Sequence, residues 1–327
     1  MLNKKLVACL AFVIALISVP IFVDSPFILH VCIMIFLYAT VGASWNILSG
    51  YAGQLSLGQS VFFGVGAYTS SALYAYLGIN PWIGMLAGIT TTMLLGIAIG
   101  LPCFRLQGRY FAIATMAIVQ IAYLVVSRIE LLGGARGIYL PMDKWGLATL
   151  TFRTKEPYYY MAMLLMFLSL IIVLCIEHSY IGYYLKTIRE DPDAAEAIGI
   201  DVPHYKMVAM HFSTFLAAIA GTFFSQYMLF IDPDSVFMLS VPVMLTAVMG
   251  GVGAMFGPLI GAAVLIPIQE ATRIYWSGAG QAIDQLIYGL LIIIMVALQP
   301  RGIMGMIDSI VTKRESKHRT LNYRPDE

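Results

Sequence analysis

Long apolar runs alternate with short polar breaks along most of the chain. An apolar run of about 20 residues lets an α-helix cross the hydrocarbon core of a bilayer. Ten such runs occur, at residues 6–23, 27–48, 59–78, 82–101, 109–127, 158–176, 207–230, 236–253, 254–272 and 282–299. The pattern predicts an all-α polytopic bundle of about eight to ten transmembrane helices, with about eight if residues 236–272 dip into the membrane and return.

Composition supports the membrane class. Charged residues make up 11% of the chain and hydrophobic residues 60%, whereas a soluble domain carries about 25% charged residues. The net charge of +1 comes with no continuous basic patch, so nucleic acid is not an expected partner. The first run lacks a small-residue cleavage site and continues through Pro20, which favours a retained helix over a signal peptide.

The basic residues predict the orientation. A cytoplasmic N-terminus places 13 of the 19 Lys and Arg residues on the inner side, as the positive-inside rule favours. Residues 1–327 then form a single transmembrane domain with both termini in the cytoplasm. Residues 128–157 form a folded external loop, residues 177–206 a cytoplasmic loop, and residues 301–327 a cytoplasmic tail.

Two glycine-rich segments interrupt the apolar pattern, at residues 50–59 and 250–262. Small residues at such spacing allow helix backbones to pack closely. Alternatively, a break within a membrane segment can line a substrate path, and the two segments together suggest two similar halves. The candidate pathway residues are Gly53, Ser56, Gly58, Gln59, Gly250, Gly251, Gly253 and Gly257.

The 177–206 loop contains the signals of a short helix. Asp191 is a suitable N-cap before Pro192, and Gly199 supplies a left-handed stop. We expect Ala194, Ala195 and Ile198 to form a small apolar face that could fit a groove on a partner protein. A solvated connector between two spans is the alternative.

Several kinds of chemistry lack their signals. The four cysteines lie in apolar runs, the histidines show no metal-ligand spacing, and no glycine-rich phosphate-binding loop occurs. We therefore predict no catalytic residue and no metal site. Polar residues within the spans are few and form no repeated carboxylate series, so an ion-coupled secondary carrier and a membrane enzyme are weaker alternatives. These residues are His30, Asn46, Gln120, His211, Gln226, Gln269 and Glu270, with Asp284 near a span end.

Four segments together resemble the branched-chain amino-acid ABC transporter permease family. They are residues 50–68, 105–115, 189–206 and 250–262. Residues 105–115 and the glycine-rich loop at 133–138 resemble the LivM-type membrane subunit rather than its LivH-type partner. Gln59 stands where many members have histidine, and Pro242 precedes the second glycine-rich segment; these departures could affect substrate choice and local helix geometry.

The resemblance implies an importer in the bacterial inner membrane. Its expected partners are a LivH-type permease subunit, cytoplasmic ATPase subunits, a periplasmic substrate-binding protein and membrane lipid. ATP and Mg would be bound by the ATPases, so this chain is expected to have no cofactor and no enzymatic activity. Relatives in the family carry urea or short amides, which leaves that substrate class open. The residues expected to couple to the ATPases are Arg189, Glu190, Asp191, Ala194, Ala195, Ile198 and Gly199.

Overall fold

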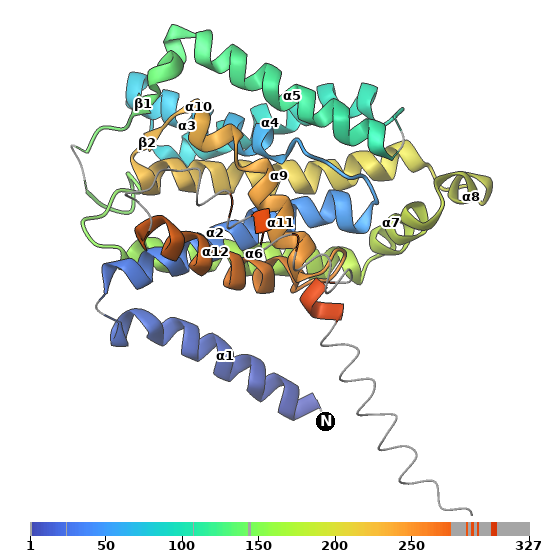
Figure 1. Cartoon of the computed structure of the whole chain (residues 1–327), viewed down its shortest axis with the longest axis horizontal. Helices are drawn as coiled ribbons and strands as arrows, with labels where there is room; N and C mark the ends of the chain where they lie inside the picture. Colours follow the sequence, from blue (N-terminus) through green and yellow to red (C-terminus); the bar gives the residue numbers. More distant parts are fainter. Residues whose placement is uncertain are drawn as a thin grey trace, which may run out of the picture.

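The chain folds into a bundle of long helices (Figure 1). The computed structural model describes residues 2–23, 25–106, 108–142 and 145–275, together with 286, 289–290, 293 and 302–305. Apart from those few positions, the expected span at 282–299 and the tail at 301–327 lie outside the described residues.

Helices make up almost all of the described regular structure. Their bounds are Leu2–Phe22 (α1), Pro26–Trp45 (α2), Gln59–Leu77 (α3), Pro81–Cys103 (α4), Arg109–Arg128 (α5), Glu156–Glu177 (α6), Tyr180–Glu190 (α7), Pro192–Ala197 (α8), Val202–Met228 (α9), Pro233–Phe237 (α10), Ser240–Gly250 (α11) and Gly257–Tyr275 (α12). A π-helical turn, Asn46–Tyr51 (η1), extends α2.

Six helical segments among the described residues are long and apolar enough to cross a membrane. They are Pro26–Tyr51, Pro81–Cys103, Arg109–Arg128, Glu156–Glu177, Val202–Met228 and Pro233–Gly250. The chain is thus an all-α polytopic membrane protein, as its hydrophobic pattern predicts.

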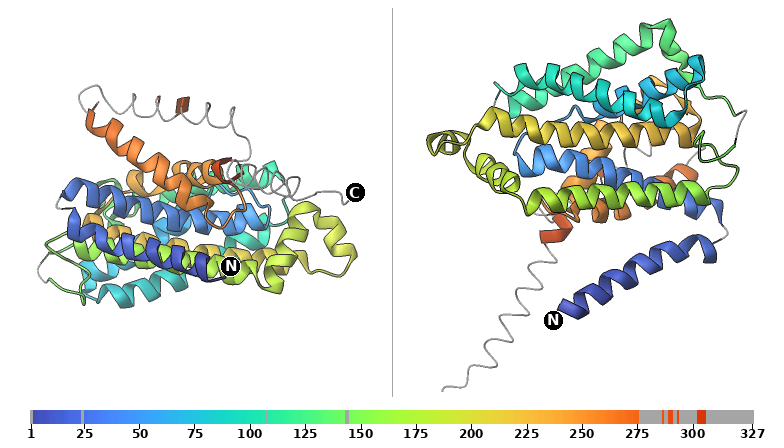
Figure 2. Two further views of the ribbon diagram at one scale, coloured as in Figure 1. Left: turned by 90° about the horizontal axis from the view of Figure 1, so that it is seen from below. Right: turned by 180° about the vertical axis from the view of Figure 1, so that it is seen from behind.

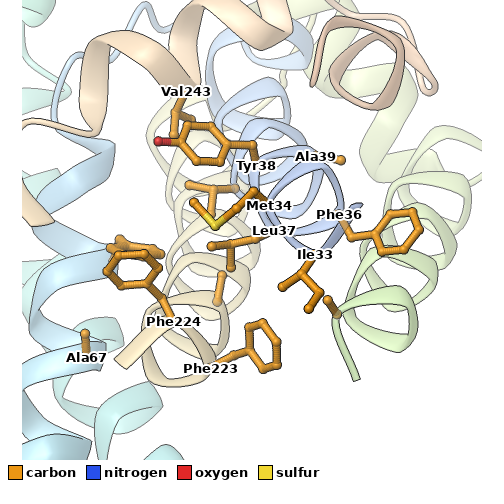
Figure 3. Packing of buried hydrophobic residues seen from close by; sticks show 14 of the residues in the cluster. Ile33, Met34, Phe36, Leu37, Tyr38, Ala39, Ala67, Phe223, Phe224 and Val243 are labelled. Carbon is orange, nitrogen blue, oxygen red and sulfur yellow. The ribbon is translucent and has the colours of Figure 1, made fainter. Parts of the chain in front are cut away.

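Helices α2 and α9 occupy the centre of the bundle and carry much of its apolar core. Leu37 of α2 and Phe223 and Phe224 of α9 are buried there (Figure 3). Helix α3 packs closely on α9 because Gly221 removes a side chain at the contact: a Cβ at that position would lie 2.0 Å from the carbonyl oxygen of Phe63. Small residues thus permit the close helix contacts that stabilise membrane bundles.

The two polar loops lie at opposite ends of the bundle (Figures 1 and 2). At one end, the strands Ile138–Tyr139 (β1) and Phe230–Ile231 (β2) pair antiparallel within a folded cap. Helices α7 and α8 project from the other end. The N-terminal end of α1 points toward the same end. The two loops are therefore separated by the length of the bundle, and the side of the membrane on which each lies stays a prediction.

One predicted span is divided. Residues 236–253 were expected to form one helix, but the structure contains α10 and α11 with a turn between them. Pro242 is the third residue of α11, where its missing N–H costs no intrahelical bond. Pro242, which the sequence analysis singled out, is therefore compatible with the first turn of α11.

Candidate functional site

The two glycine-rich segments meet at the α7–α8 end of the bundle through Asn46. The Asn46 Nδ2 donates to the carbonyl oxygen of Ala254 at 2.9 Å, and its Oδ1 accepts from the N–H of Gly253 at 2.8 Å. Asn46 is fully buried at the start of the π-helical turn. One side chain thus satisfies two backbone groups of a segment more than 200 residues away in sequence.

Arg189 joins this junction from α7. Its Nη1 donates to the carbonyl oxygen of Gly50 at 2.8 Å. Gly53, with a φ of +70°, lies directly against Arg189, since a Cβ there would be 3.1 Å from the Arg189 Cα. A Cβ at Gly253 would lie 2.5 Å from Nη1. We call Asn46, Gly50, Gly53, Arg189 and Gly253 the motif junction, because it brings three of the sequence motifs together.

Hydrogen bonds among residues 45–58 fix the chain between η1 and α3. Ser56 is 1% exposed, and its N–H donates to the Ser49 Oγ at 3.1 Å. The Ser56 carbonyl accepts from the Trp45 Nε1 at 2.6 Å, and its Oγ accepts from the N–H of Gly58 at 3.1 Å. Ser56 and Gly58 therefore shape the break that the sequence predicts.

Gln59 begins α3 and is fully buried. Its Nε2 donates to the Oγ of Ser44 and, at 3.1 Å, to the Oγ of Ser213. The glutamine thus links α2, α3 and α9 by a polar contact in the bundle interior. At this position, where the family resemblance led us to expect histidine, the amide supplies a donor without a charge.

The second glycine-rich segment is held by backbone packing. A Cβ at Gly250 would lie 1.6 Å from the carbonyl oxygen of Gly257, and one at Gly257 would lie 2.4 Å from that of Gly251. Gly251 itself has a φ of +128°, which favours glycine. The turn between α11 and α12 therefore requires glycine at these positions.

The loop helix has the ends that the sequence predicts. The Asp191 Oδ1 accepts from the N–H groups of Asp193 and Ala194 at 2.9 and 3.1 Å. Gly199 has a φ of +89°, and the N–H groups of Gly199 and Ile200 donate to the carbonyls of Glu196 and Ala195, as in a Schellman motif. The predicted cap and stop are confirmed.

The predicted outward face of α8 is wrong at Ala195. This residue is fully buried and packs against Ile188 and Val202 of the same loop, because the Schellman turn folds the chain back over it. Ala194 and Ile198 are exposed, Ile198 at 72%. A charged substitution at Ala195 would therefore disrupt the loop itself, and Ala194 and Ile198 are the outward residues.

An apolar cavity of about 570 Å³ lies between α5, α10 and α11. Leu57 of the first break, Met116 of α5, Phe237 of α10 and Leu245 of α11 line it, and Gln120 adds a polar group. None of the predicted pathway residues lines it. The first glycine-rich segment reaches the cavity only through Leu57.

A second polar cluster lies at the opposite end. His30 of α2 contacts the Tyr227 OH through Nδ1 at 2.5 Å, and its Nε2 lies 3.8 Å from the Glu270 Oε2. Arg273 approaches the same carboxylate at 3.6 Å. These contacts connect α2, α9 and α12, so the intramembrane His30 and Glu270 have structural partners. In the described part of the chain, no three His, Cys, Asp or Glu residues gather as metal ligands.

Known proteins provide an independent comparison. The model of the family described as "Branched-chain amino acid transport system / permease component" matches residues 27–296. The chain belongs to this family. It is 28% identical to the "High-affinity branched-chain amino acid transport system permease protein LivM" of Salmonella typhimurium over 90% of this chain and 75% of that protein.

Two further relatives of this permease are matched over most of their own lengths. It is 24% identical to the protein named LivH of Escherichia coli, over 82% of this chain and 91% of LivH. It is 23% identical to the probable LivM of Methanocaldococcus jannaschii, over 82% of this chain and 90% of that protein. The comparisons thus confirm the predicted family and its LivM-type assignment.

Sequence reasoning identified Asn46 only as a polar residue within a span, and it did not connect Asn46 with the glycine-rich segments of the permease. Thr115 was noticed only as part of a motif, yet its Oγ1 accepts from the N–H of Leu57 at 3.0 Å. The signal available for Asn46 was its place four residues before Gly50. That spacing puts the asparagine one turn from the break.

Proposed function

We propose that this chain is the LivM-type permease subunit of an ATP-driven importer of branched-chain or related amino acids in the bacterial inner membrane. The complete transporter also contains a LivH-type subunit, two cytoplasmic ATPases and a periplasmic binding protein. ATP and Mg bind to the ATPases, and this chain hydrolyses nothing. Family membership supports the permease role. The motif junction supports the mechanism, because it connects α7 with both glycine-rich segments.

In this mechanism α8 is the coupling helix. An ATPase docks on the outward residues Ala194 and Ile198, and its movement displaces α7 and α8 together. Arg189 carries the displacement to both glycine-rich segments, since it donates to Gly50 and lies against Gly53 and Gly253. These segments connect α2 with α3 and α11 with α12, so a small shift alters how the four helices pack.

The apolar cavity supports an aliphatic substrate over urea. Urea is small and polar and would leave its hydrogen-bonding groups unsatisfied against Leu57, Met116 and Leu245. A branched aliphatic side chain removes apolar surface from water in such a cavity. The Gln120 amide supplies a polar contact at the same wall.

The proposed orientation places α7 and α8 in the cytoplasm and the β1–β2 cap in the periplasm. Tyr139 in the cap is 75% exposed, and Ala194 on α8 is exposed. Tyr139→Cys should react with an impermeant thiol reagent in intact cells, and Ala194→Cys should react only after lysis. Both variants are made with Cys175→Ser, because Cys175 is exposed. The reverse pattern would invert the topology.

Reconstitution tests the function. Proteoliposomes containing the assembled transporter and the binding protein should accumulate labelled leucine when ATP is supplied to the ATPases, and uptake should survive collapse of the proton gradient. An ATPase-inactive partner should stop uptake. Leucine uptake driven by a proton gradient without ATPases would establish a secondary carrier instead, and saturable uptake of urea without leucine would establish the urea or amide alternative.

A further inference from the structure

A second, polar pocket of about 380 Å³ lies beside the motif junction, between the first glycine-rich segment, the start of α5 and the α7–α8 corner. Its wall includes Gln54, Arg109, Arg189 and Lys206. Every charged residue in its lining is a cation. We call it the cationic pocket.

Lys206 is the deepest of these cations. It is 3% exposed, and no hydrogen bond or ion pair within 4.0 Å holds its ammonium group among the described residues. The carboxylates of Asp193 and Glu196 on α8 act on it only from a longer distance. The ammonium group opens onto the pocket, and an anion bound there would supply the close counter-ion that it lacks.

Gln54 adds a buried amide to the pocket wall. Its side chain is 6% exposed, and its Oε1 is buried without a hydrogen-bond partner. Buried polar atoms in folded proteins nearly always have a partner. This oxygen is enclosed rather than open to the pocket, so Gln54 forms part of the wall and the three cations would recognise the anion.

The rim of the pocket leads toward the bilayer. Arg109 and Tyr110 are the first residues of α5, and beyond them Tyr110, Ile113 and Met116 are 61%, 63% and 52% exposed. These three residues recur every third position along one side of α5 and form an apolar strip. Tyrosine and arginine at the end of a spanning helix are typical of the membrane interface.

We propose that the cationic pocket binds the phosphate headgroup of an anionic phospholipid. Arg109, Arg189 and Lys206 face the phosphate oxygens, and the acyl chains lie along Tyr110 and Ile113 of α5. Basic pockets between helix ends suit such headgroups. The bound lipid would connect α5 with the α7–α8 corner and the first glycine-rich segment, independently of what the permease transports.

Native mass spectrometry of the full-length chain tests this, with phosphatidylglycerol and phosphatidylcholine of identical acyl chains as probes. Phosphatidylglycerol should be retained more tightly than phosphatidylcholine. Arg109→Gln should weaken its binding about fivefold, the contribution of one cation near an anionic headgroup. Arg105→Gln is the matched control, since Arg105 is exposed in the same loop and does not line the pocket, and it should bind like the parent.

Lys206→Gln should weaken binding further, and its thermal transition is measured alongside because the residue is buried. Arg109 is exposed, so the Arg109→Gln result decides the proposal even if the Lys206 variant fails to fold. Equal retention of both lipids, or equal losses in the Arg109 and Arg105 variants, would overturn it. Inorganic phosphate that raises the thermal transition when phosphatidylglycerol does not would also overturn it and assign the pocket to a soluble phosphate compound.

Discussion

The two glycine-rich segments meet at one junction but use their glycines differently. In residues 50–58, glycine makes room for side chains: Gly53 lies against Arg189, and Gly58 lies beside Thr115. In residues 250–257, Gly250 and Gly257 make room for backbone, whereas Gly253 lies against the Arg189 Nη1. We infer that Arg189 acts on both segments, through Gly53 and Gly253, whereas the backbone packing of Gly250 against Gly257 provides a fixed support for the turn into α12.

Gly250→Ala should have the largest effect on folding. The new Cβ would lie 1.6 Å from the carbonyl oxygen of Gly257, and relief requires the backbone of α11 or α12 to move, at roughly 3 kcal/mol or more. The expected result is little monodisperse protein after detergent extraction. Gly289→Ala is the control, because no atom of the described residues lies within 4 Å of its added Cβ. Equal yields of the two variants would contradict the fixed support.

Asn46→Leu should come next, because it keeps the branched shape of the side chain and removes both bonds to the second segment. Two partly buried backbone groups, the N–H of Gly253 and the carbonyl of Ala254, lose their partner. The unfolding free energy should fall by about 2 kcal/mol, measured by denaturant titration in detergent. Asn46→Asp keeps an acceptor for Gly253 but sets a buried carboxylate oxygen against the carbonyl of Ala254, so it should also destabilise the protein. A fully stable Asn46→Leu variant would show that the segments meet without this residue.

Gly53→Ala separates backbone strain from contact with Arg189. Gly53 and Gly78 have φ values of +70° and +64°. Gly53 has a close neighbour in Arg189, whereas no atom in the described part of the chain lies within 4 Å of a Cβ at Gly78. Gly78→Ala should cost about 1 kcal/mol from conformation alone, and Gly53→Ala somewhat more. Leucine uptake in proteoliposomes should fall only in Gly53→Ala. Equal uptake by both variants would show that transport does not depend on the contact between Gly53 and Arg189.

Ile198→Asp should have the smallest effect on stability, within about 0.5 kcal/mol, because the side chain is 72% exposed. Uptake should nevertheless be lost, since a carboxylate would enter the apolar contact with the ATPase. Leu131→Asp, at a residue 74% exposed in the opposite loop, should leave ATPase association unchanged. If Ile198→Asp transports normally, α8 is only a connector.

Local features of the site were predictable from sequence and distant contacts were not. The Asp191 cap and the Gly199 stop depend on neighbours within a few residues, so residue type sufficed. The burial of Ala195 depends on Ile188 and Val202, which approach only after the loop folds back. Helical spacing alone could not reveal this.

The helical class followed from hydrophobicity, because every apolar run must satisfy its backbone internally in a bilayer. The meeting of the two glycine-rich segments did not follow. It rests on Asn46 reaching Gly253, and nothing in the composition of either segment specifies that pair.

Photo-cross-linking from α8 tests the central claim most directly. A photoreactive phenylalanine analogue is placed at Ile198 in the assembled transporter, with Tyr139 in the opposite cap as the matched position, since both side chains are at least 72% exposed. The account predicts that Ile198 cross-links to an ATPase subunit, that the yield changes when ATP is bound, and that Tyr139 gives no such product. An assembled, transporting complex in which Ile198 forms no ATPase cross-link would contradict α8 as the coupling helix.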